Sequence, residues 1–311
     1  MTTAWLFPGQ GSQFVGMARD LYETYASARA VIDAADAALG FSLSKLMFEG
    51  PEAELTDTLN TQPALLAHSI AALAALQQAT ANTLPTATLC AGHSLGEYSA
   101  LVAAGALDFA DGIKLVRARG AAMKRAGELR PGAMAALIGL DDAKLNEICQ
   151  TAGAVQVANY NAPGQIVLSG EKGALERAVE LAKQAGAKRA IVLAVSIAAH
   201  SELMRSAVED FRAAVFNTPL NIPRLPIVSN VTAQPMRQVE TIRAEMLAQL
   251  TSAVQWTRSV ELMQAQGVSV FLELGPKDVL TGLNKRIVRG AAAHPLGTRE
   301  QIAKYVEGMS Q

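Results

Sequence analysis

The chain has 311 residues, of which 50% are hydrophobic and 18% are charged, and its formal net charge is −1. This composition supports a large core and excludes a disordered chain, and the near-neutral charge gives no general attraction to nucleic acid or anionic membranes. No apolar run reaches the roughly 20 residues of a membrane-spanning helix, and MTTAWLFPGQG lacks the basic leader of a signal peptide. Cys90 and Cys149 are isolated, which argues against a disulfide framework or a zinc site. We therefore expect a cytoplasmic α/β protein.

The first part of the chain alternates short apolar segments, typical of buried strands, with helical patterns. Glycine-rich turns interrupt it, PGQG at residues 8–11 and GHSLG at residues 92–96. We expect strands at residues 4–7 and 88–91, and helices at 62–79, at 97–104 and from Asp108 or Asp111 to 126.

The middle of the chain, residues 132–195, predicts six elements in the order strand, helix, strand, strand, helix, strand. The two central strands, 155–159 and 165–169, are separated by the turn NAPG. This order is the split-βαβ signature of a ferredoxin-like module. Helices and strands alternate again after residue 200. We therefore expect a small subdomain over 128–196, inserted into a larger α/β domain formed by 1–127 and 197–311.

Gly92-His93-Ser94-Leu95-Gly96 fits the G-x-S-x-G pattern of a nucleophile elbow. Small flanking residues are needed because the serine lies on a tight, strained turn that side chains would obstruct. The turn also places Ser94 at a helix N-terminus, where the Leu95 N–H can face a developing oxyanion. Glycine-flanked serines are common, so the motif alone leaves an ordinary strand–helix turn equally open.

A serine nucleophile needs a base, usually histidine, and the chain has four. His68 lies in an alanine- and leucine-rich helix, which suggests packing, and His294 lies near the C-terminus in a segment expected at the surface. His93 precedes Ser94 on a sharp turn, so its side chain should diverge and line the site. His200 follows an apolar strand at the expected domain boundary and comes after the serine, as in α/β-hydrolases. By elimination, His200 is the best base.

Arg119 lies on a face of small and apolar residues of its predicted helix, with Leu115, Ala122 and Ala126. A guanidinium at such a position is partly buried and should have an anionic partner. The partner can be an internal carboxylate, which would make Arg119 structural. It can also be a substrate carboxylate, which arginine binds in bidentate fashion better than lysine does.

The loop Gly9-Gln10-Gly11-Ser12-Gln13 lacks both the third glycine of G-x-G-x-x-G and the Gly-Lys-Ser/Thr of a Walker loop. Nucleotide binding is therefore weakly supported. Because the loop follows a strand, it can instead present Gln10 as a polar donor near the elbow.

Longer motifs occur together and in order, and some contain the residues just described. They are LFPGQGSQ near the start, TQPALL at 61–66, GHSLGEYSALVAAG at 92–105, RARG with Arg119, NYNAPGQ at 159–165, a strand ending in His200, VQW at 254–256 and ELGP at 273–276. Through them the chain closely resembles, over nearly its whole length, the malonyl-CoA:acyl carrier protein transacylases of type II fatty acid synthesis and the acyltransferase domains of polyketide synthases. The resemblance implies an α/β-hydrolase-like core with an inserted ferredoxin-like subdomain, in agreement with the predicted element order.

The resemblance also implies a catalytic set. Ser94 would be the acylated nucleophile and His200 its base. Gln255, in the VQW motif, would orient His200 through its backbone carbonyl, in place of the aspartate of a hydrolase triad. Gln10 and the N–H of Leu95 would form the oxyanion hole.

The substrate residues implied by the resemblance surround the nucleophile. Arg119 would pair with the free carboxylate of malonate, and Gln62, His93 and Asn161 would line the pocket, with Asn159 in a less defined role. Many family members have a proline or aromatic residue and then serine or phenylalanine before the catalytic histidine, whereas this chain has Ala198 and Ala199. A small α-substituent on the malonyl group is therefore open.

The implied partners are malonyl-CoA and an acyl carrier protein that docks transiently, with no metal or redox cofactor, no nucleic acid and no membrane, and we expect a monomer. The carrier can belong to fatty acid, polyketide or malonate decarboxylase machinery. Two other functions stay open. A serine esterase or thioesterase would have a carboxylate on His200 and no need for Arg119, and a non-catalytic subunit would use the fold for assembly or carrier binding.

Overall fold

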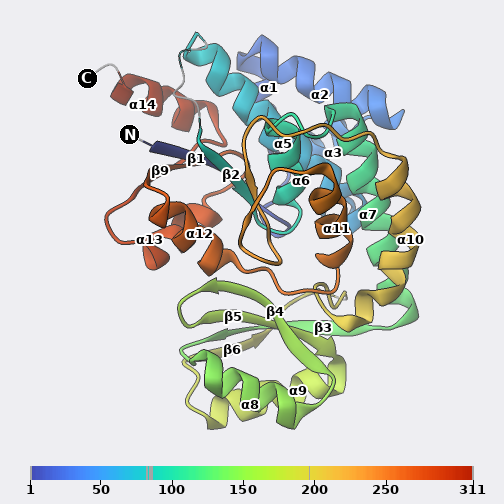
Figure 1. The fold of residues 1–311 in the computed structure, drawn as a ribbon. Coiled ribbons are helices and arrows are strands. Elements are labelled where there is room, and N and C mark those ends of the chain that lie inside the picture. Colours follow the sequence, from blue (N-terminus) through green and yellow to red (C-terminus); the bar gives the residue numbers. More distant parts are fainter. Residues whose placement is uncertain (1, 82, 84–86, 196, 310–311) are drawn as a thin grey trace.

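The computed structural model describes residues 2–81, 83, 87–195 and 197–309, which form two sheets, each with its own helices (Figure 1). The larger sheet has the strand order β10-β9-β1-β2-β7-β8, and the smaller has the order β4-β5-β3-β6. Strands of the larger sheet are β1 (Thr2–Phe7), β2 (Leu89–Gly92), β7 (Ile227–Val228), β8 (Pro235–Met236), β9 (Val268–Glu273) and β10 (Ala292–Pro295). Within the described part of the chain, no helix is long and apolar enough to cross a membrane.

The larger sheet is buried on both faces. Along β1, Trp5 and Phe7 belong to one apolar cluster, while Ala4 and Leu6 belong to another, because successive side chains of a strand point to opposite faces. Its strands therefore read as continuous apolar runs, as expected for parallel strands covered by helices. The helices of this part are α1 (Arg19–Thr24), α2 (Ala26–Leu39), α3 (Leu43–Glu49), α4 (Glu52–Thr56), α5 (Thr58–Ala79), α6 (Gly96–Ala103), α7 (Phe109–Leu129), α10 (Arg205–Asn217), α11 (Val239–Ala248), α12 (Trp256–Ala265), α13 (Val279–Ile287) and α14 (Arg299–Met309).

Strand register brings the ends of several strands to one edge of this sheet. β1 pairs in parallel with both β2 and β9, with Phe7 opposite Gly92 and Leu6 opposite Glu273. The PGQG loop, the GHSLG turn and the ELGP segment therefore leave the sheet side by side. Ligand sites of open α/β sheets lie at this carboxyl edge.

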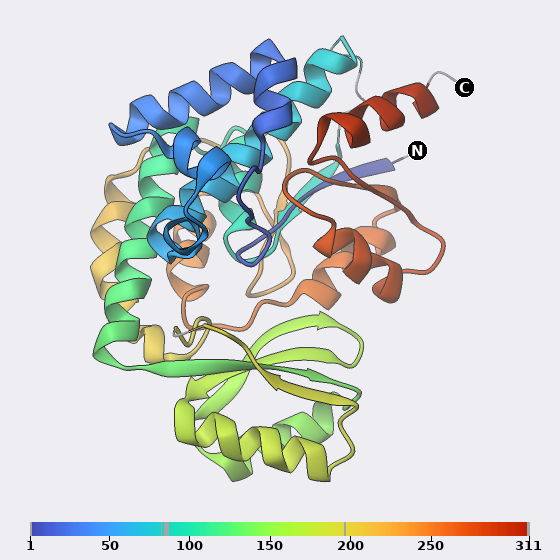
Figure 2. The ribbon, with the colours of Figure 1, turned by 180° about the vertical axis from the view of Figure 1, so that it is seen from behind.

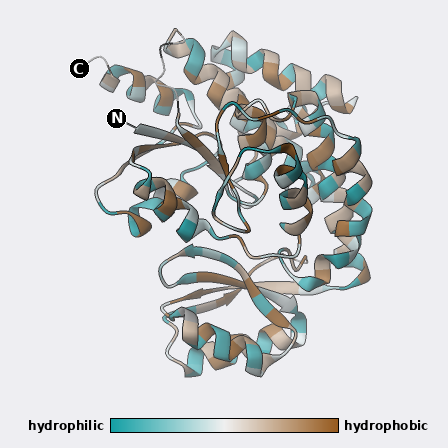
Figure 3. Ribbon diagram, in the orientation of Figure 1, coloured by the Kyte–Doolittle hydropathy of each residue, from teal (hydrophilic) through white to brown (hydrophobic). Residues whose placement is uncertain are grey.

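The smaller sheet is antiparallel throughout and lies below the larger one in Figures 1 and 2. Its elements are β3 (Gly132–Ile138), α8 (Asp142–Ala152), β4 (Val155–Ala162), β5 (Gln165–Glu171), α9 (Lys172–Gln184) and β6 (Arg189–Val192). Helices α8 and α9 pack on one face, and both carry brown and teal residues in Figure 3. On the other face, Met134, Ala158 and Val167 pack against Ala199, next to His200. This sheet therefore supports the segment that carries the histidine.

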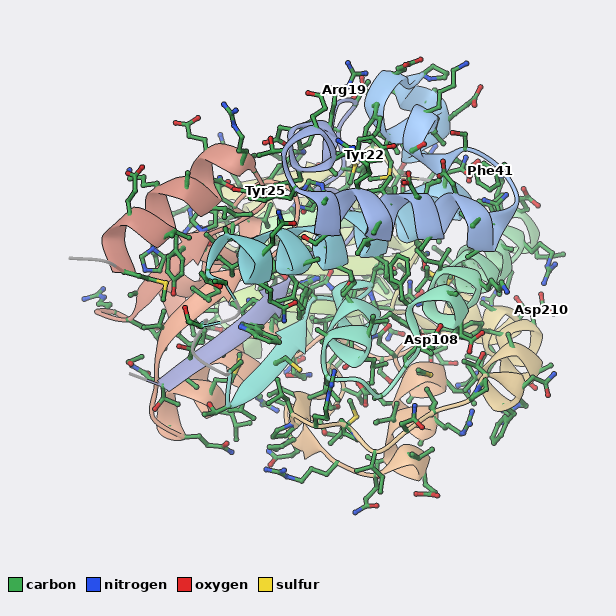
Figure 4. The ribbon with its side chains drawn as sticks, turned by 90° about the horizontal axis from the view of Figure 1, so that it is seen from above. Arg19, Tyr22, Tyr25, Phe41, Asp108 and Asp210 are labelled. Carbon is green, nitrogen blue, oxygen red and sulfur yellow. The ribbon has the colours of Figure 1, made fainter. Side chains whose placement is uncertain are left out.

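Helix α7 carries Arg119 and is held at several points. The Asp108 side chain accepts hydrogen bonds from the N–H groups of Ala110 and Asp111, so Asp108 is the N-cap, and the alternative start at Asp111 is excluded. Such a cap contributes about 1 kcal/mol. Further along, Arg125 forms a salt bridge to Asp210 of α10, with Nη2 3.0 Å from Oδ2; Asp108 and Asp210 are labelled in Figure 4.

Candidate active site

The GHSLG turn is a tight elbow in which the backbone of Ser94 is left-handed, with φ of 51°. A Cβ at Gly92 would overlap the backbone of Gly96, and a Cβ at Gly96 would overlap the carbonyl of Phe7. Both glycines are therefore required by close backbone contacts. They allow the strained serine to stand between β2 and α6.

His200 lies against Ser94, with its Nε2 2.8 Å from the serine Oγ. Its Nδ1 lies 2.8 Å from the backbone oxygen of Gln249. A carbonyl only accepts, so Nδ1 carries the proton and Nε2 is free to accept from the serine hydroxyl. Burial, and then the nearby charge of Arg119, lower the pKa of His200 to about 3, which keeps the ring neutral.

Gln249, and not Gln255 as the VQW motif led us to expect, presents its carbonyl to His200. The carbonyl of Gln255 instead accepts hydrogen bonds from the N–H and the hydroxyl of Ser259, because Gln255 is the residue before the first turn of α12. Gln249 follows the last residue of α11, where a carbonyl has no helical donor and can turn to a side chain.

Arg119 is buried, with 1% of its surface exposed, and its guanidinium points at the same place. Nη1 donates to Oε1 of Gln62 at 2.9 Å, and Nη2 donates to Oε1 of Gln249 at 2.9 Å and to Oγ of Ser94 at 3.3 Å. The ring of Tyr98 lies 5.4 Å from Cζ. Among the described residues, no aspartate or glutamate forms a salt bridge with it. An arginine cation thus stands beside the serine with only neutral hydrogen-bond acceptors.

The other predicted pocket residues lie either against Arg119 or at the contact between the elbow and the smaller sheet. Gln62 is fully buried and contacts Arg119 directly. His93 Nε2 lies 2.8 Å from Oδ1 of Asn161, which joins the elbow to β4 of the smaller sheet. Asn159 is buried and forms a parallel bridge with Val254, so the structure places its backbone in the connection between the two parts of the fold.

The PGQG loop packs directly on the elbow, since a Cβ at Gly9 would overlap the carbonyl of His93. The side chain of Gln10 accepts a hydrogen bond from the Thr58 hydroxyl at 3.0 Å. Within the described part of the chain, the backbone N–H groups of Gln10 and Leu95 have no protein acceptor. Both remain available as donors near Ser94.

Two amide side chains that were not predicted from the sequence form hydrogen bonds to the backbone of the elbow. Asn230 accepts from the N–H of Ser94 and donates to the carbonyl of Gly92, both at 2.7 Å. Gln249 donates to the carbonyl of Ser94 at 3.1 Å. The position of Asn230, two residues after β7, is the only signal in the sequence, since polar residues at strand ends mark this edge.

Comparison with known proteins agrees with this geometry. A family model described as an acyl transferase domain matches residues 4–305. Malonyl CoA-acyl carrier protein transacylases of Escherichia coli strain K12 and Bacillus subtilis strain 168 are 45% and 46% identical, over 98% and 99% of this chain and 98% and 97% of theirs.

Solved structures show the same fold over the whole chain. An acyl-carrier-protein S-malonyltransferase from Bartonella henselae is 42% identical with a TM-score of 0.94, and 100% of both chains are covered. A malonyl-transacylase solved in complex with a type II PKS acyl-carrier protein is 41% identical, also with a TM-score of 0.94, and covers 99% of this chain and 100% of its own. The chain therefore belongs to the malonyl-CoA:acyl carrier protein transacylase family.

Proposed function

We propose that this enzyme transfers a malonyl group from malonyl-CoA to the phosphopantetheine thiol of an acyl carrier protein, through an ester on Ser94. The observation that carries the proposal is Arg119, a buried cation without a carboxylate partner among the described residues, 3.3 Å from the serine hydroxyl. A buried arginine needs an anion, and the free carboxylate of malonate supplies one in bidentate geometry. This arrangement favours the substrate reading of Arg119 over the structural one.

In the first half-reaction, Ser94 Oγ attacks the thioester carbonyl while its proton passes to Nε2 of His200. The oxyanion is stabilised by the backbone N–H groups of Leu95 and Gln10. Collapse of the intermediate releases CoA, whose thiolate takes the proton from His200. In the second half-reaction, the carrier thiol gives its proton to His200 and attacks the malonyl-serine, and Ser94 recovers its proton as it leaves. No step requires a metal or a redox cofactor.

We also infer an α/β-hydrolase-like catalytic domain, residues 1–127 and 197–311, with a ferredoxin-like subdomain over 128–196. The order β3-α8-β4-β5-α9-β6 and the antiparallel arrangement β4-β5-β3-β6 support the second part. The elbow after β2 and the parallel strands around β1 support the first. Since the proposed donor and acceptor, a highly charged CoA thioester and a carrier protein, are both water-soluble, we place the enzyme in the cytoplasm.

The esterase alternative predicts a carboxylate on His200, whereas the Nδ1 atom faces the carbonyl of Gln249. It also gives no reason for a buried cation at the nucleophile. The non-catalytic alternative gives no reason for a serine–histidine hydrogen bond of 2.8 Å. The first two observations favour transfer over hydrolysis, and the third favours a catalytic role.

Incubation with malonyl-CoA should add one malonyl group to the peptide that contains Ser94, because Ser94 is the only hydroxyl bonded to His200 among the described residues. Peptide mass spectrometry after rapid acid quenching measures the adduct. Ser94→Ala should give none, while Ser99→Ala, a buried serine on α6, should retain it. A malonyl group on another residue would contradict the proposal.

Reversing exposed basic clusters to glutamate should weaken transfer to the carrier and leave serine acylation nearly unchanged. Lys188 and Arg189 form one exposed cluster, and Lys285, Arg286 and Arg289 form another. Carrier proteins are typically acidic, so a basic surface should attract them, most strongly at low salt. Both half-reactions are measured separately at low and high salt. If both fall together, the cluster supports the fold or CoA binding; if neither falls, the carrier docks elsewhere.

A further inference from the structure

Two buried carboxyl groups lie behind the elbow and take no part in the steps above. Glu97, on α6, is 1% exposed, and Glu245, on α11, is 6% exposed. Their carboxyls lie side by side, because Glu97 accepts from the N–H of Asn230 and Glu245 accepts from the N–H of Val231, the next residue. Burial of one carboxyl is costly and burial of two in contact is more so, so their presence calls for an explanation.

Each carboxyl is surrounded by donors. Glu97 accepts from the N–H of Asn230 at 2.8 Å through Oε1, and from the side-chain amide of Gln249 through Oε2. Glu245 accepts from the hydroxyl of Ser229 at 2.7 Å and from the N–H of Val231 at 2.9 Å. The residues that Glu97 holds, Asn230 and Gln249, are the two amides that hold the nucleophile turn.

Gln249 connects Glu97 to the reacting groups. Its side-chain oxygen accepts from Arg119, its side-chain nitrogen donates to the carbonyl of Ser94, and its backbone oxygen accepts from His200. The two ends of an amide have nearly the same shape, so only their partners fix the orientation. The two oxygens of Glu97 both accept, Oε1 from the N–H of Asn230 and Oε2 from the side-chain nitrogen of Gln249. Glu97 therefore directs the nitrogen of Gln249 to itself and leaves the oxygen for the guanidinium.

The charge of the pair also bears on Arg119. Two carboxylates in contact and out of water cannot both ionise, so one proton stays with the pair. Burial, and then the proximity of Glu245, raise the pKa of Glu97 well above its usual range, and burial raises that of Glu245. The neighbouring charged or titratable groups are Arg119 and Tyr98. The proximity of Glu97 favours the charged form of the guanidinium.

We propose that Glu97 and Glu245 share one proton and act as a positioning pair, in which Glu97 fixes the amide of Gln249 and thereby the places of Arg119 and His200. The kinetic part of this proposal rests on the proposed malonyl transfer. The shared proton does not.

The kinetic test is Glu97→Gln. Glutamine has one acceptor oxygen where glutamate has two, so the amide of Gln249 loses its fixed orientation and can turn an N–H toward Arg119. Misplacement of a reacting group costs up to about a hundredfold in rate. We expect kcat/KM for serine acylation by malonyl-CoA to fall tenfold or more by this estimate, and the preference for malonyl-CoA over acetyl-CoA to fall with it.

Glu273→Gln is the matched control. Glu273 is also 1% exposed and accepts two N–H groups, from Leu280 at 2.9 Å and Thr281 at 2.7 Å, but it contacts none of the residues around Ser94. It should lower the melting temperature without changing the malonyl-to-acetyl preference. If Glu97→Gln behaves in the same way, with activity lost only in proportion to folded protein, the positioning role is overturned.

Infrared spectroscopy tests the proton without any assay of transfer. At pH 8.5 the wild-type protein should show the carbonyl stretch of a protonated carboxylic acid, and Glu245→Gln should shift this band because the carboxyl that shares the proton is gone. Glu273→Gln should leave the band in place. Absence of the band from the wild type, or an unshifted band in Glu245→Gln, would overturn the shared proton. If the wild type shows the band but forms no malonyl-serine, the proposed function fails and the pair stands.

Discussion

His200→Ala should slow the acylation of Ser94 by about 10³- to 10⁴-fold, since a positioned general base contributes up to about that factor. Without the imidazole, the only remaining side-chain partner of the serine hydroxyl among the described residues is Arg119, which donates, so the proton has to pass to water. The rate is measured by quenching the reaction with acid and counting malonyl groups bound to the precipitated protein.

His68→Gln is the control for that experiment. His68 is also buried, and its Nε2 lies 2.8 Å from the carbonyl oxygen of Gly297, away from the nucleophile. It should cost stability but leave the rate per folded molecule close to that of the wild type. Similar losses from both variants would show that His200 is a packing residue.

The same histidine sets the expected pH dependence. Its folded pKa of about 3 lies below the usual value of about 6.5, so the ring is neutral and competent from pH 8 to well below pH 6. The kcat/KM of acylation should show no fall near pH 6.5. The unfolded chain binds this proton near pH 6.5 and the folded chain does not, so His200 makes the fold less stable as the pH falls from about 6.5 toward 3. An acid limb near pH 6.5 with intact circular dichroism would contradict this assignment.

Arg119→Ala should lower the preference for malonyl-CoA over acetyl-CoA by about tenfold or more, because a charge-assisted bidentate contact is worth a few kcal/mol. Arg119→Lys keeps the charge but not the two-pronged geometry and should give an intermediate preference. The measurement is kcat/KM for the two thioesters.

Arg117→Ala is the control on the same helix. Arg117 is half-buried and donates to Asn60, so its removal disturbs α7 without removing a contact to Ser94. It should leave the preference unchanged. A constant preference in Arg119→Ala would instead make Arg119 a structural residue.

Local sequence patterns predicted the parts of the site that depend on a few neighbouring residues. The spacing of Gly92, Ser94 and Gly96 predicted the elbow because the steric requirement is confined to one turn. Arg119 was recognisable because a charge on a small, apolar helix face needs an explanation.

The amides and carboxyls behind the elbow were not predictable in this way. Asn230 and Gln249 meet Ser94 across more than a hundred residues of sequence, and only the position of Asn230 just after a strand distinguishes it from other polar residues. Gln255 was expected from the VQW motif to accept from His200. Whether a backbone carbonyl is free to accept from a side chain, however, depends on where a helix begins and ends. Those boundaries are the least certain part of a pattern.

The predicted elements occur in the expected order, but α2, α3, α4 and α11 were not predicted and some strand ends differ. The turn expected from residue 161 begins later, because β4 continues to Ala162 through two irregularities in its register with β5. Asn161 is therefore a strand residue, and this places its side chain against His93. The two-residue strand β8 and the four-residue β10 were too short to give an alternating pattern.

The neutral carbonyl that accepts from His200 affects which nucleophile can attack the acyl-serine in the second half-reaction. Because Nδ1 faces a carbonyl and not a carboxylate, and because a guanidinium lies nearby, the ring is a weak base. A weak base assists acidic nucleophiles most: a thiol with a pKa of about 8.5 gives up its proton far more readily than water, whose pKa is about 15.7. A thiol entering the site is therefore favoured over the surrounding water, and the acyl ester survives until a thiol arrives.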